Sequence, residues 1–431
     1  MNRGRSRSTT ARRKAAALAA SIATCLTLQL ALLGASSAER SGPPPTPVPP
    51  RGSPSPFPQS LATPADAVAS PRLDAPAAIL AELDHGQIMF AKAPRMRRPI
   101  ASLTKVMTAL IVLERRDLEH VVEITPAAIF DDDEYGASSI LGLRVGERRT
   151  VRQLLDALML QSANDAALAL AIDIGGTQQG FVDLMNERAH ALGLRRTEFF
   201  SPNGLDDRGR SSVRDLLVLT RAAYAAPGFA QIVASRFRTI PAPRGRPRRV
   251  QNRNALLWLY PGAIGAKTGF TAVAGYCLIA TAEREGRRLI VVVLGDRNEA
   301  FSEAATLLDH GFEAFEERTF VRAGQGIGTV AIRGGAVAVE AARSITSLVP
   351  TAEIDSVREQ VVALADAVFP PAQGERVGTL TVSIPGAPLG SSALIVADVP
   401  PPPPSGDDAW WQRAAGALGR SIGQALGGLV G

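Results

Sequence analysis

The chain has 431 residues, of which 46% are hydrophobic, so it can form two or three domains with substantial cores. Aromatic residues make up only 5% of the chain, which argues against a base-stacking surface, and we expect no nucleic-acid partner. The formal net charge of +6 stems from residues 1–38, which hold six cations and no acid, so the remainder is neutral and gives no general reason to expect a polyanion partner.

Residues 1–38 are typical of an export signal. A basic start ending at Lys14 is followed by an apolar stretch from Ala15 to about Leu33 and by small residues up to Ala38, after which we expect cleavage. The apolar stretch is longer than a typical signal core, so an uncleaved membrane anchor is the alternative. We therefore expect an exported protein, in the periplasm or on the extracytoplasmic face of the cytoplasmic membrane. Cleavage would leave Cys277 as the only cysteine and no intramolecular disulfide.

The next two parts of the chain differ sharply in composition. Residues 39–71 are rich in proline, serine, alanine and glycine, which predicts an extended linker. Residues 72–318 begin with a hairpin pattern, continue with helical periodicity and end with a second strand pair and a helix, which predicts one mixed α/β (α+β) domain. The strands are expected at 77–83, 87–91, 275–282 and 289–294, and the helices at 102–115, 151–174, 181–192, 213–225 and 299–315.

Two further parts follow the mixed domain. Runs of β-branched residues with glycine turns, Phe320–Ala341 and Val377–Val399, predict a small all-β domain over 319–399. Residues 400–431 begin with five prolines and continue with an amphipathic pattern, which predicts a tail that lies on a membrane surface. Its glycines weaken a helix, so a tail that packs on its own domain or has no structure is the alternative.

Lysine is the rarest cation in the chain: only four positions carry it, against 43 arginines. Arginine stays protonated in proteins, whereas a desolvated lysine can lose its proton and act as a base. Lys105 lies in Ser102-Leu103-Thr104-Lys105, and this spacing places the serine hydroxyl and the amine one helical turn apart on one face. A serine needs an adjacent base to become a nucleophile, so Ser102 and Lys105 are a candidate pair. A capping serine beside a surface lysine is the alternative.

Two other short motifs contribute candidate groups. Lys267 lies in Gly265-Ala266-Lys267-Thr268-Gly269, just before a predicted strand, where a cation, a hydroxyl and permissive glycines could meet a ligand. A second cation near Lys105 would also lower the pKa of Lys105. Ser162-Ala163-Asn164 offers a hydroxyl and an amide at a break in a predicted helix. Taken singly, these motifs are also compatible with a turn and a helix cap.

The order of the three motifs is more specific than any one of them. Ser-x-x-Lys, Ser-x-Asn and Lys-Thr-Gly, in this order within one exported domain, are typical of penicillin-recognising serine enzymes. The surrounding residues resemble the low-molecular-weight penicillin-binding proteins that are serine-type D-alanyl-D-alanine carboxypeptidases. The matching segments are 99–108, 161–166, 201–205, 252–258, 267–271 and 274–277. The resemblance covers about residues 72–318, and less specifically the β domain and the tail.

This resemblance implies a β-lactamase/DD-peptidase-like catalytic domain, an antiparallel sheet flanked by helices with a helical subdomain. It implies that Ser102 attacks the penultimate D-Ala carbonyl of a peptidoglycan D-Ala-D-Ala stem peptide, that Lys105 accepts its proton and that β-lactams acylate the same serine. The further implied roles are a proton relay and substrate contacts at Ser162 and Asn164, carboxylate binding at Lys267, Thr268 and Arg253, and an oxyanion hole at the N–H groups of Ser102 and Phe270, next to Gly269. No cofactor is implied.

Three other functions remain as alternatives. A D,D-endopeptidase would use the same groups on peptidoglycan cross-links. A class A β-lactamase would need a Glu-x-x-Leu-Asn setting, which the surroundings of Glu198 do not reproduce. A non-catalytic peptidoglycan-binding scaffold would not need the three intact motifs. Phe270 departs from the polar residue that many relatives carry after Lys-Thr-Gly, which could change rate or substrate preference.

The remaining polar groups give no metal site. The four histidines are isolated from one another, so we expect none to bind a metal. The acidic run Asp131–Glu134 is typical of a solvated loop, with a calcium site as the alternative. The arginines at 244, 246, 248 and 249 are typical of a solvated hairpin, with contact to an anionic polymer as the alternative.

Overall fold

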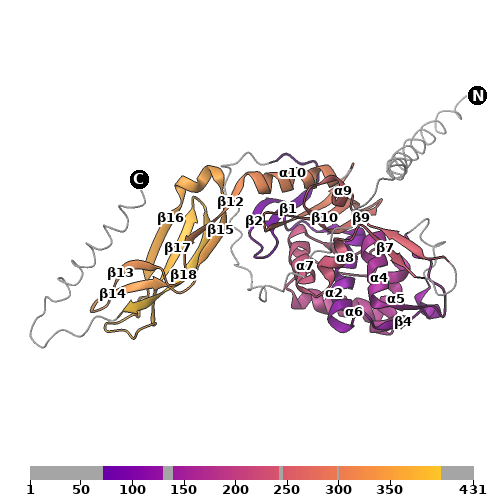
Figure 1. The fold of residues 1–431 in the computed structure, drawn as a ribbon, viewed down its shortest axis with the longest axis horizontal. Coiled ribbons are helices and arrows are strands. Elements are labelled where there is room, and N and C mark those ends of the chain that lie inside the picture. The colour runs from indigo at the N-terminus through magenta and orange to yellow at the C-terminus, as the bar shows by residue number, and fades with distance from the viewer. Residues whose placement is uncertain (1–70, 130–138, 242–245, 299, 399–431) are drawn as a thin grey trace, which may run out of the picture. The chain divides into compact units, whose positions relative to one another are not determined.

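The computed structural model describes residues 71–129, 139–241, 246–298 and 300–398 (Figure 1). The predicted export signal, almost all of the linker, the acidic run Asp131–Glu134 and the tail lie outside the described residues. Within those ranges, every helix is too short or too polar to cross a membrane.

The centre of the catalytic part is an antiparallel five-stranded sheet. Its strands are β1 (Ala77–Glu82), β2 (Ile88–Lys92), β9 (Ala263–Thr271), β10 (Gly275–Arg284) and β11 (Arg287–Asp296). Their order is β2-β1-β11-β10-β9, so segments from the two ends of the domain meet in the middle of the sheet. Both predicted strand pairs are confirmed. Strand β9 was not predicted, because its alanines, glycines and Lys267 lack the β-branched alternation of an ordinary strand.

Strand β11 shows why helices cover both faces of this sheet. Leu289, Val291 and Val293 belong to one apolar core, which the helix α10 (Ala300–Glu313) covers. The alternating side chains Ile290, Val292 and Leu294 belong to the other core, with the main group of helices. Successive strand residues point to opposite faces, so a continuous apolar run requires a cover on each side.

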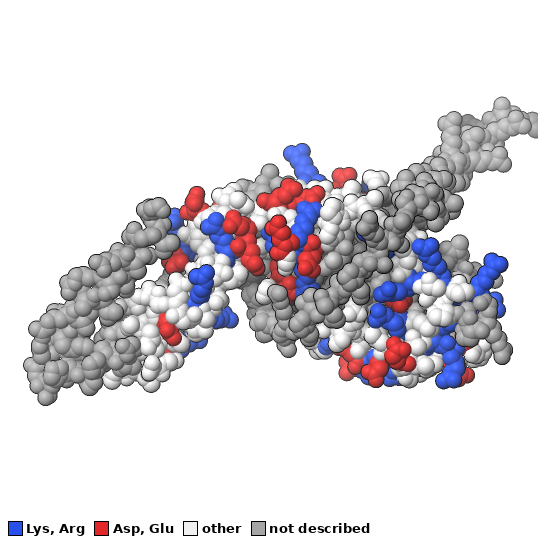
Figure 2. Space-filling view, viewed as in Figure 1, with Lys and Arg blue, Asp and Glu red and all other residues white. Residues whose placement is uncertain are grey.

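The helical part of the domain packs on the second face (Figure 1). Its longer helices are α2 (Lys105–Arg115), α5 (Asn164–Gly175), α6 (Gln178–Ala191) and α7 (Val213–Ala225), and its shorter ones are α4 (Val151–Asp156), α8 (Phe229–Val233), η1 (Ala101–Thr104), η2 (Pro126–Ala128) and the π-helical turn η3 (Ala157–Gln161). The short helix α9 (Leu256–Leu259) instead contributes Leu256 to the core on the first face. Three small ribbons accompany them: β3 (Arg98–Pro99) with β6 (Arg210–Ser211), β4 (Val121–Glu123) with β5 (Arg148–Thr150), and β7 (Phe237–Ile240) with β8 (Arg248–Gln251). Figure 2 shows basic side chains gathered over the region where Figure 1 labels β7 and α4.

The predicted helix over 151–174 is divided into three parts. A capping box at Thr150 and Gln153 starts α4, the turn η3 follows it, and α5 begins at Asn164. Between η3 and α5, Ser162 adopts a left-handed backbone conformation with φ 67°. A break at Ser162-Ala163-Asn164 within this helical pattern was predicted, and the structure confirms it between η3 and α5.

The C-terminal described part is all-β, as predicted. Strands β13 (Gly326–Ile332), β14 (Gly335–Ala341), β16 (Arg358–Ala363), β17 (Arg376–Ile384) and β18 (Ala387–Asp398) form a sheet of order β13-β14-β18-β17-β16, and β12 (Phe315–Val321) pairs with β15 (Ile345–Pro350). A short turn, η4 (Thr351–Ser356), follows β15. Their inward valines, leucines and isoleucines form a core of their own. The predicted fold class, an α/β (α+β) catalytic domain followed by an all-β domain, is confirmed.

Candidate active site

Ser102 lies in the first turn of a helix that is anchored by close backbone contacts. It belongs to η1, which runs directly into α2. Ala101, just before it, has φ 46°, a left-handed conformation that costs free energy for a residue with a side chain. A Cβ on Gly269 of β9 would lie 3.1 Å from the Ser102 nitrogen, so a side chain there would crowd the turn and glycine favours this close approach of the two backbones. The serine is therefore held between the start of α2 and strand β9.

Lys105 is completely buried and makes three short contacts with its amine. Its Nζ donates to Ser102 Oγ at 3.0 Å, to Asn164 Oδ1 at 2.8 Å and to the Asn203 carbonyl at 2.6 Å. Burial lowers the pKa of Lys105 well below its ordinary value, and the nearby charges of Lys267 and Arg253 lower this pKa further. A lowered pKa makes it easier for this amine to release one of its protons, and the lone pair left beside Ser102 Oγ could then accept the serine proton, as a general base does.

Asn203 is a member of the site that sequence reasoning gave no role. Its segment, Ser201-Pro202-Asn203-Gly204, lies against the nucleophile turn: Thr108 Oγ1 of α2 donates to the Pro202 carbonyl at 2.6 Å. Gly204 has φ 81°, and a Cβ there would overlap the Ala101 carbonyl. Asn203 lies in the segment 201–205 that carries the resemblance, but only the fold shows that the Asn203 carbonyl accepts from Lys105.

The break between η3 and α5 brings the second motif to Lys105. Asn164 contacts the Lys105 amine directly, and Ser162 is buried two residues before it. The neighbouring Asp165 accepts from the backbone N–H groups of Leu141, Gly142 and Leu143 at 2.8–3.0 Å. A carboxylate that binds several backbone donors fixes that loop against the start of α5, a role for Asp165 that sequence reasoning missed.

The third motif lies within β9 rather than just before a strand. Lys267 is 1% exposed, and its Nζ donates to the carbonyl of the next residue, Thr268, at 2.8 Å. Burial lowers the pKa of Lys267 to about 7, and the charge of Arg253 contributes. The backbone N–H of Arg253 donates to the Leu160 carbonyl in η3 at 3.0 Å, and the charge of Arg253 acts on both lysines, so three cations share this site.

Phe270 differs from the other candidates because its ring faces solvent. The side chain is 56% exposed and packs on Tyr276 of β10, with 4.6 Å between ring centroids. The structure thus brings Ser102, Lys105, Asn164, Lys267 and Arg253 together in one site. Gly269 shapes the backbone there, while the Phe270 ring lies at the edge.

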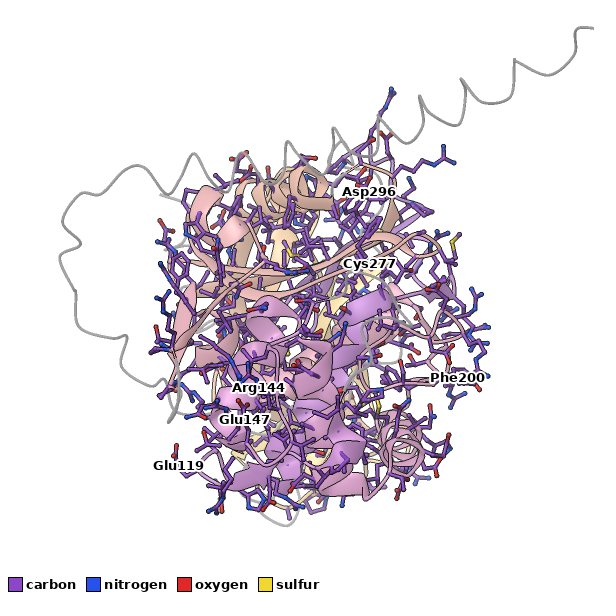
Figure 3. The ribbon with its side chains drawn as sticks, turned by 90° about the vertical axis from the view of Figure 1, so that its right-hand side faces the viewer. Glu119, Arg144, Glu147, Phe200, Cys277 and Asp296 are labelled. Atoms are coloured by element: carbon purple, nitrogen blue, oxygen red, sulfur yellow. The ribbon has the colours of Figure 1, made fainter. Side chains whose placement is uncertain are left out.

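Cys277 is a core residue, as predicted. It lies on β10 opposite Gly269 of β9, and it is buried with its side chain in the sheet (Figure 3). Burial raises the pKa of the Cys277 thiol to about 11, so the thiol is protonated and unreactive at neutral pH.

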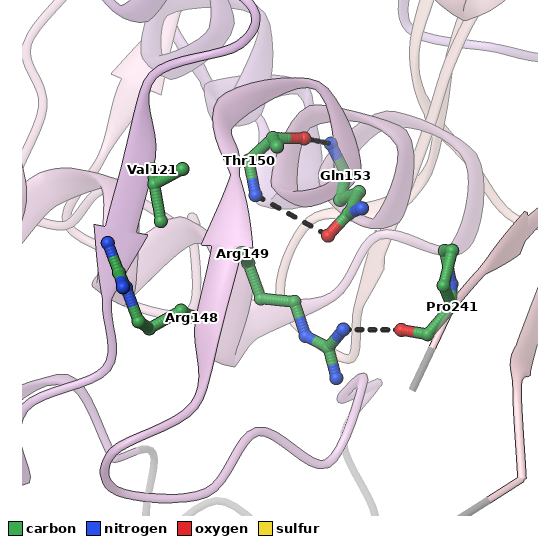
Figure 4. Close-up of a pocket in the computed structure, with 6 residues that line it drawn as sticks. All are labelled: Val121, Arg148, Arg149, Thr150, Gln153 and Pro241. Atoms are coloured by element: carbon green, nitrogen blue, oxygen red, sulfur yellow. Dashed lines mark hydrogen bonds between the residues drawn. The ribbon is translucent and has the colours of Figure 1, made fainter. Parts of the chain in front are cut away.

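We also searched the described residues for a metal-binding cluster and for cavities away from Ser102. Histidine, cysteine, aspartate and glutamate form no cluster of three or more there that could hold a metal ion. A cavity of about 350 Å³ lies elsewhere in the helical part (Figure 4). Its lining comprises Val121, Arg148, Arg149, Thr150, Gln153 and Pro241, none of which belongs to the Ser102 site.

Because Lys267 is buried, replacing it with an uncharged residue should stabilise the fold. The pKa of Lys267 is about 7 in the folded protein and 10.5 in the unfolded chain. Between these two pH values the unfolded chain therefore binds more protons than the folded protein. The contribution of Lys267 to the free energy of unfolding consequently falls as the pH falls from 10.5 to 7. Replacing Lys267→Met should raise the free energy of unfolding at pH 7 by about 2–4 kcal/mol. Denaturant unfolding at pH 7 and pH 10 measures this, and the gain should shrink at pH 10.

A matched control uses a described lysine outside the site. Lys92 Nζ donates to the Leu73 carbonyl at 2.6 Å, so Lys92→Met removes a hydrogen bond and should not stabilise the fold. Equal stability of the Lys267→Met protein and the wild type at pH 7 would contradict the assignment of a costly buried cation.

Comparison with known proteins gives a consistent result. The family model described as D-alanyl-D-alanine carboxypeptidase matches residues 64–298. The D-alanyl-D-alanine carboxypeptidase DacB2 of Mycobacterium tuberculosis is 39% identical over 257 residues, 58% of this chain and 86% of that protein. The carboxypeptidase DacA of Escherichia coli is 30% identical over 341 residues, 76% of this chain and 83% of that protein.

Solved structures extend the similarity beyond the catalytic domain. Penicillin-binding protein 6B from Escherichia coli superposes with a TM-score of 0.64 and 30% identity, over 78% of this chain and 98% of that one. Penicillin-binding protein 5 from Haemophilus influenzae gives a TM-score of 0.65 with 28% identity, over 77% and 99% of the two chains. These coverages exceed the length of the catalytic domain, so the similarity includes the β domain.

Proposed function

Because this chain belongs to the D-alanyl-D-alanine carboxypeptidase family, we propose that it removes the terminal D-Ala from peptidoglycan stem pentapeptides through an acyl-enzyme on Ser102. The observation that carries the proposal is the contact between Lys105 Nζ and Ser102 Oγ, 3.0 Å long, made by an amine whose pKa burial lowers. It is a serine peptidase of the peptidoglycan layer, and penicillins, which resemble D-Ala-D-Ala, acylate the same serine.

The first half of the reaction forms the acyl-enzyme. Ser102 Oγ attacks the carbonyl carbon of the penultimate D-Ala while its proton passes to Lys105 Nζ. The bond from that carbon to the nitrogen of the terminal D-Ala then breaks, and the leaving amine takes a proton, for which Ser162 is the relay between Lys105 and the amine. In the second half, water attacks the ester carbon, Ser102 regains its proton and the shortened peptide leaves.

The surrounding groups bind and orient the peptide. Lys267, Thr268 and Arg253 hold the terminal carboxylate, since a cluster of cations favours an anion and arginine offers a forked donor. Asn164 holds a substrate amide with its side chain, whose Oδ1 also accepts from Lys105. The backbone N–H groups of Ser102 and Phe270 stabilise the negative oxygen of the tetrahedral intermediate; the close approach of Gly269 to η1 supports this role.

The location follows from the sequence and is part of the proposal. The export signal at residues 1–38 delivers the enzyme outside the cytoplasm, where its substrate lies, and the linker at 39–71 precedes the folded part. The amphipathic tail at 400–431 associates with the membrane surface. The enzyme would thus work in the periplasm or at the extracytoplasmic face of the cytoplasmic membrane.

The test uses the purified protein beside its Ser102→Ala variant. We expect a fluorescent penicillin to label the wild type covalently and a D-Ala-D-Ala pentapeptide to release D-Ala, and we expect the variant to lose both, by at least about 10³-fold. Labelling without D-Ala release would contradict the carboxypeptidase and favour a D,D-endopeptidase or a penicillin-binding scaffold. Labelling of the Ser102→Ala protein would exclude Ser102 as the nucleophile.

A further inference from the structure

The segment next to the active site has an unusual charge distribution. Between Asp215 and Glu283 the chain contains nine cations and no acidic residue, although the chain beyond residue 38 is neutral as a whole. Six of these cations are described arginines close to the hairpin of β7 and β8 (Figure 2), namely Arg236, Arg238, Arg246, Arg248, Arg249 and Arg253. A local excess of one sign creates a field that attracts the opposite sign.

One face of the β7–β8 hairpin is neutralised by the domain beneath it. Ile240 and Val250 are buried there, and the arginines that share their face form ion pairs. Arg248 lies 2.7 Å from Glu147, and Arg238 lies 3.8 Å from Asp156. Arg248, which also donates to both oxygens of Glu147, fixes the hairpin on the domain, whereas Arg238 keeps 41% of its side chain exposed beside Asp156.

Two exposed arginines of the hairpin contact aromatic rings instead of carboxylates. Arg249, on the opposite face, lies over the Phe237 ring at 4.1 Å, and Phe237 meets Trp258 edge-on with centroids 5.6 Å apart. Arg236, just before β7, lies 6.0 Å over Trp258. We call Arg236, Phe237, Arg249 and Trp258 the arginine–aromatic strip.

The charges of this strip face solvent without a neutralising partner in the described part of the chain. There, neither Arg236 nor Arg249 has a carboxylate within ion-pair distance, in contrast to Arg238 and Arg248. The rings beneath the guanidinium groups restrict their motion, so less conformational entropy is lost when an anion binds. Phe237 and Trp258 are themselves only partly buried.

The arginine–aromatic strip borders the catalytic residues. Arg236 Nε donates to the Leu257 carbonyl of α9 at 2.9 Å, and α9 packs on β9, the strand of Lys267. At the same end of the hairpin, where the Asn252 N–H donates to the Arg236 carbonyl at 2.9 Å, β8 leads within two residues to Arg253, whose charge acts on both active-site lysines. A polymer attached to a peptide in the active site would reach this strip without leaving the surface.

We propose that the arginine–aromatic strip binds the peptidoglycan strand that carries the substrate peptide, with its arginines on carboxylates of neighbouring stem peptides and its rings against the sugars. This inference rests on the proposed function. An arginine fork matches a carboxylate, and a partly exposed ring offers the flat apolar surface that a sugar face can cover. Contact at a second point raises the effective concentration of the polymer at the active site, which a short soluble peptide cannot exploit.

The test separates polymer binding from catalysis. Full-length Ser102→Ala protein, which cannot turn over substrate, is co-sedimented with purified sacculi, either untreated or with their carboxyl groups coupled to ethanolamine. The strip variant is Arg236→Gln/Arg249→Glu, in which Gln can still donate to the Leu257 carbonyl. The matched control, Arg322→Gln/Arg358→Glu, makes the same charge change at exposed positions of the β domain.

We expect the strip variant to bind untreated sacculi about tenfold more weakly than the control, and we expect ethanolamine coupling or higher salt to weaken the control to a similar level. The strip substitutions are also made in protein that keeps Ser102. If this protein releases D-Ala from a soluble pentapeptide as fast as the wild type, its active site is intact. Equal sedimentation of strip and control variants would overturn the inference, as would binding to phosphatidylglycerol vesicles but not to sacculi. Failure of the wild type to release D-Ala would instead overturn the proposed function, whatever the sedimentation shows.

Discussion

Replacing Lys105→Arg should lower the rate of penicillin acylation and of D-Ala release by about 10³-fold although the positive charge is kept. The Lys105 amine can act as a base only because it can lose its proton, and the guanidinium of arginine cannot. The larger guanidinium also does not fit between Ser102 Oγ, Asn164 Oδ1 and the Asn203 carbonyl, which all contact one nitrogen in the wild type. Stopped-flow acylation with a fluorescent penicillin measures the effect.

The pH dependence gives an independent readout of the same group. Lys105 must be neutral to accept the serine proton, so acylation should rise with pH as its amine deprotonates, at a pH well below the ordinary lysine value. Lys92→Arg, outside the active site, should leave rate and profile unchanged. A Lys105→Arg protein within tenfold of the wild-type rate would mean that another group is the base.

Replacing Gly204→Ala should destabilise the domain by about 3 kcal/mol or more and abolish labelling at the temperature where the wild type is folded. The new methyl would overlap the Ala101 carbonyl, next to the nucleophile, and would displace the Asn203 carbonyl from Lys105. The left-handed backbone at this position adds a smaller cost. Denaturant unfolding and penicillin labelling on the same samples measure both effects.

Gly193→Ala separates the two costs. Gly193 has nearly the same backbone conformation, φ 71° against 81° at Gly204, but a Cβ there meets no atom within 4 Å. The Gly193→Ala protein should therefore lose only about 1 kcal/mol of unfolding free energy and should be labelled by penicillin as fully as the wild type. Similar losses for both variants would show that conformation, and not the contact with Ala101, dominates at Gly204.

The sequence predicted those helices and strands in which the spacing of apolar residues matches the faces that are buried. Strands β10 and β11 are continuous apolar runs, as burial on both faces requires, and the helices α2, α7 and α10 repeat their apolar residues on one face. It could not predict β9, because the alanines, glycines and Lys267 of this strand have low strand propensity. The break at Ser162-Ala163-Asn164 was predicted, but the left-handed backbone of Ser162 was not, because a polar pattern at a break does not specify φ.

Contacts between segments that are distant in the sequence were the second feature that could not be predicted. That the Asn203 carbonyl would accept from an amine 98 residues away depends on tertiary packing, as does the loop that Asp165 fixes. The arginines around the β7–β8 hairpin were visible as a charge run, but the sequence could not tell that Arg248 is ion-paired while Arg249 lies on a ring. Strand alternation assigns them to opposite faces only once the register is known.

Strand β9 is the last strand of the five-stranded sheet, and within the described residues only β10 pairs with it. Its outer edge therefore offers backbone donors and acceptors to an extended chain, beside the serine and on the strand that carries Lys267. A peptide bound there as one more strand would be held by hydrogen bonds to its main chain rather than by contacts with its side chains. Bonds of this kind would be the same for any side chain along the bound peptide, so they would place no demand on its residue types.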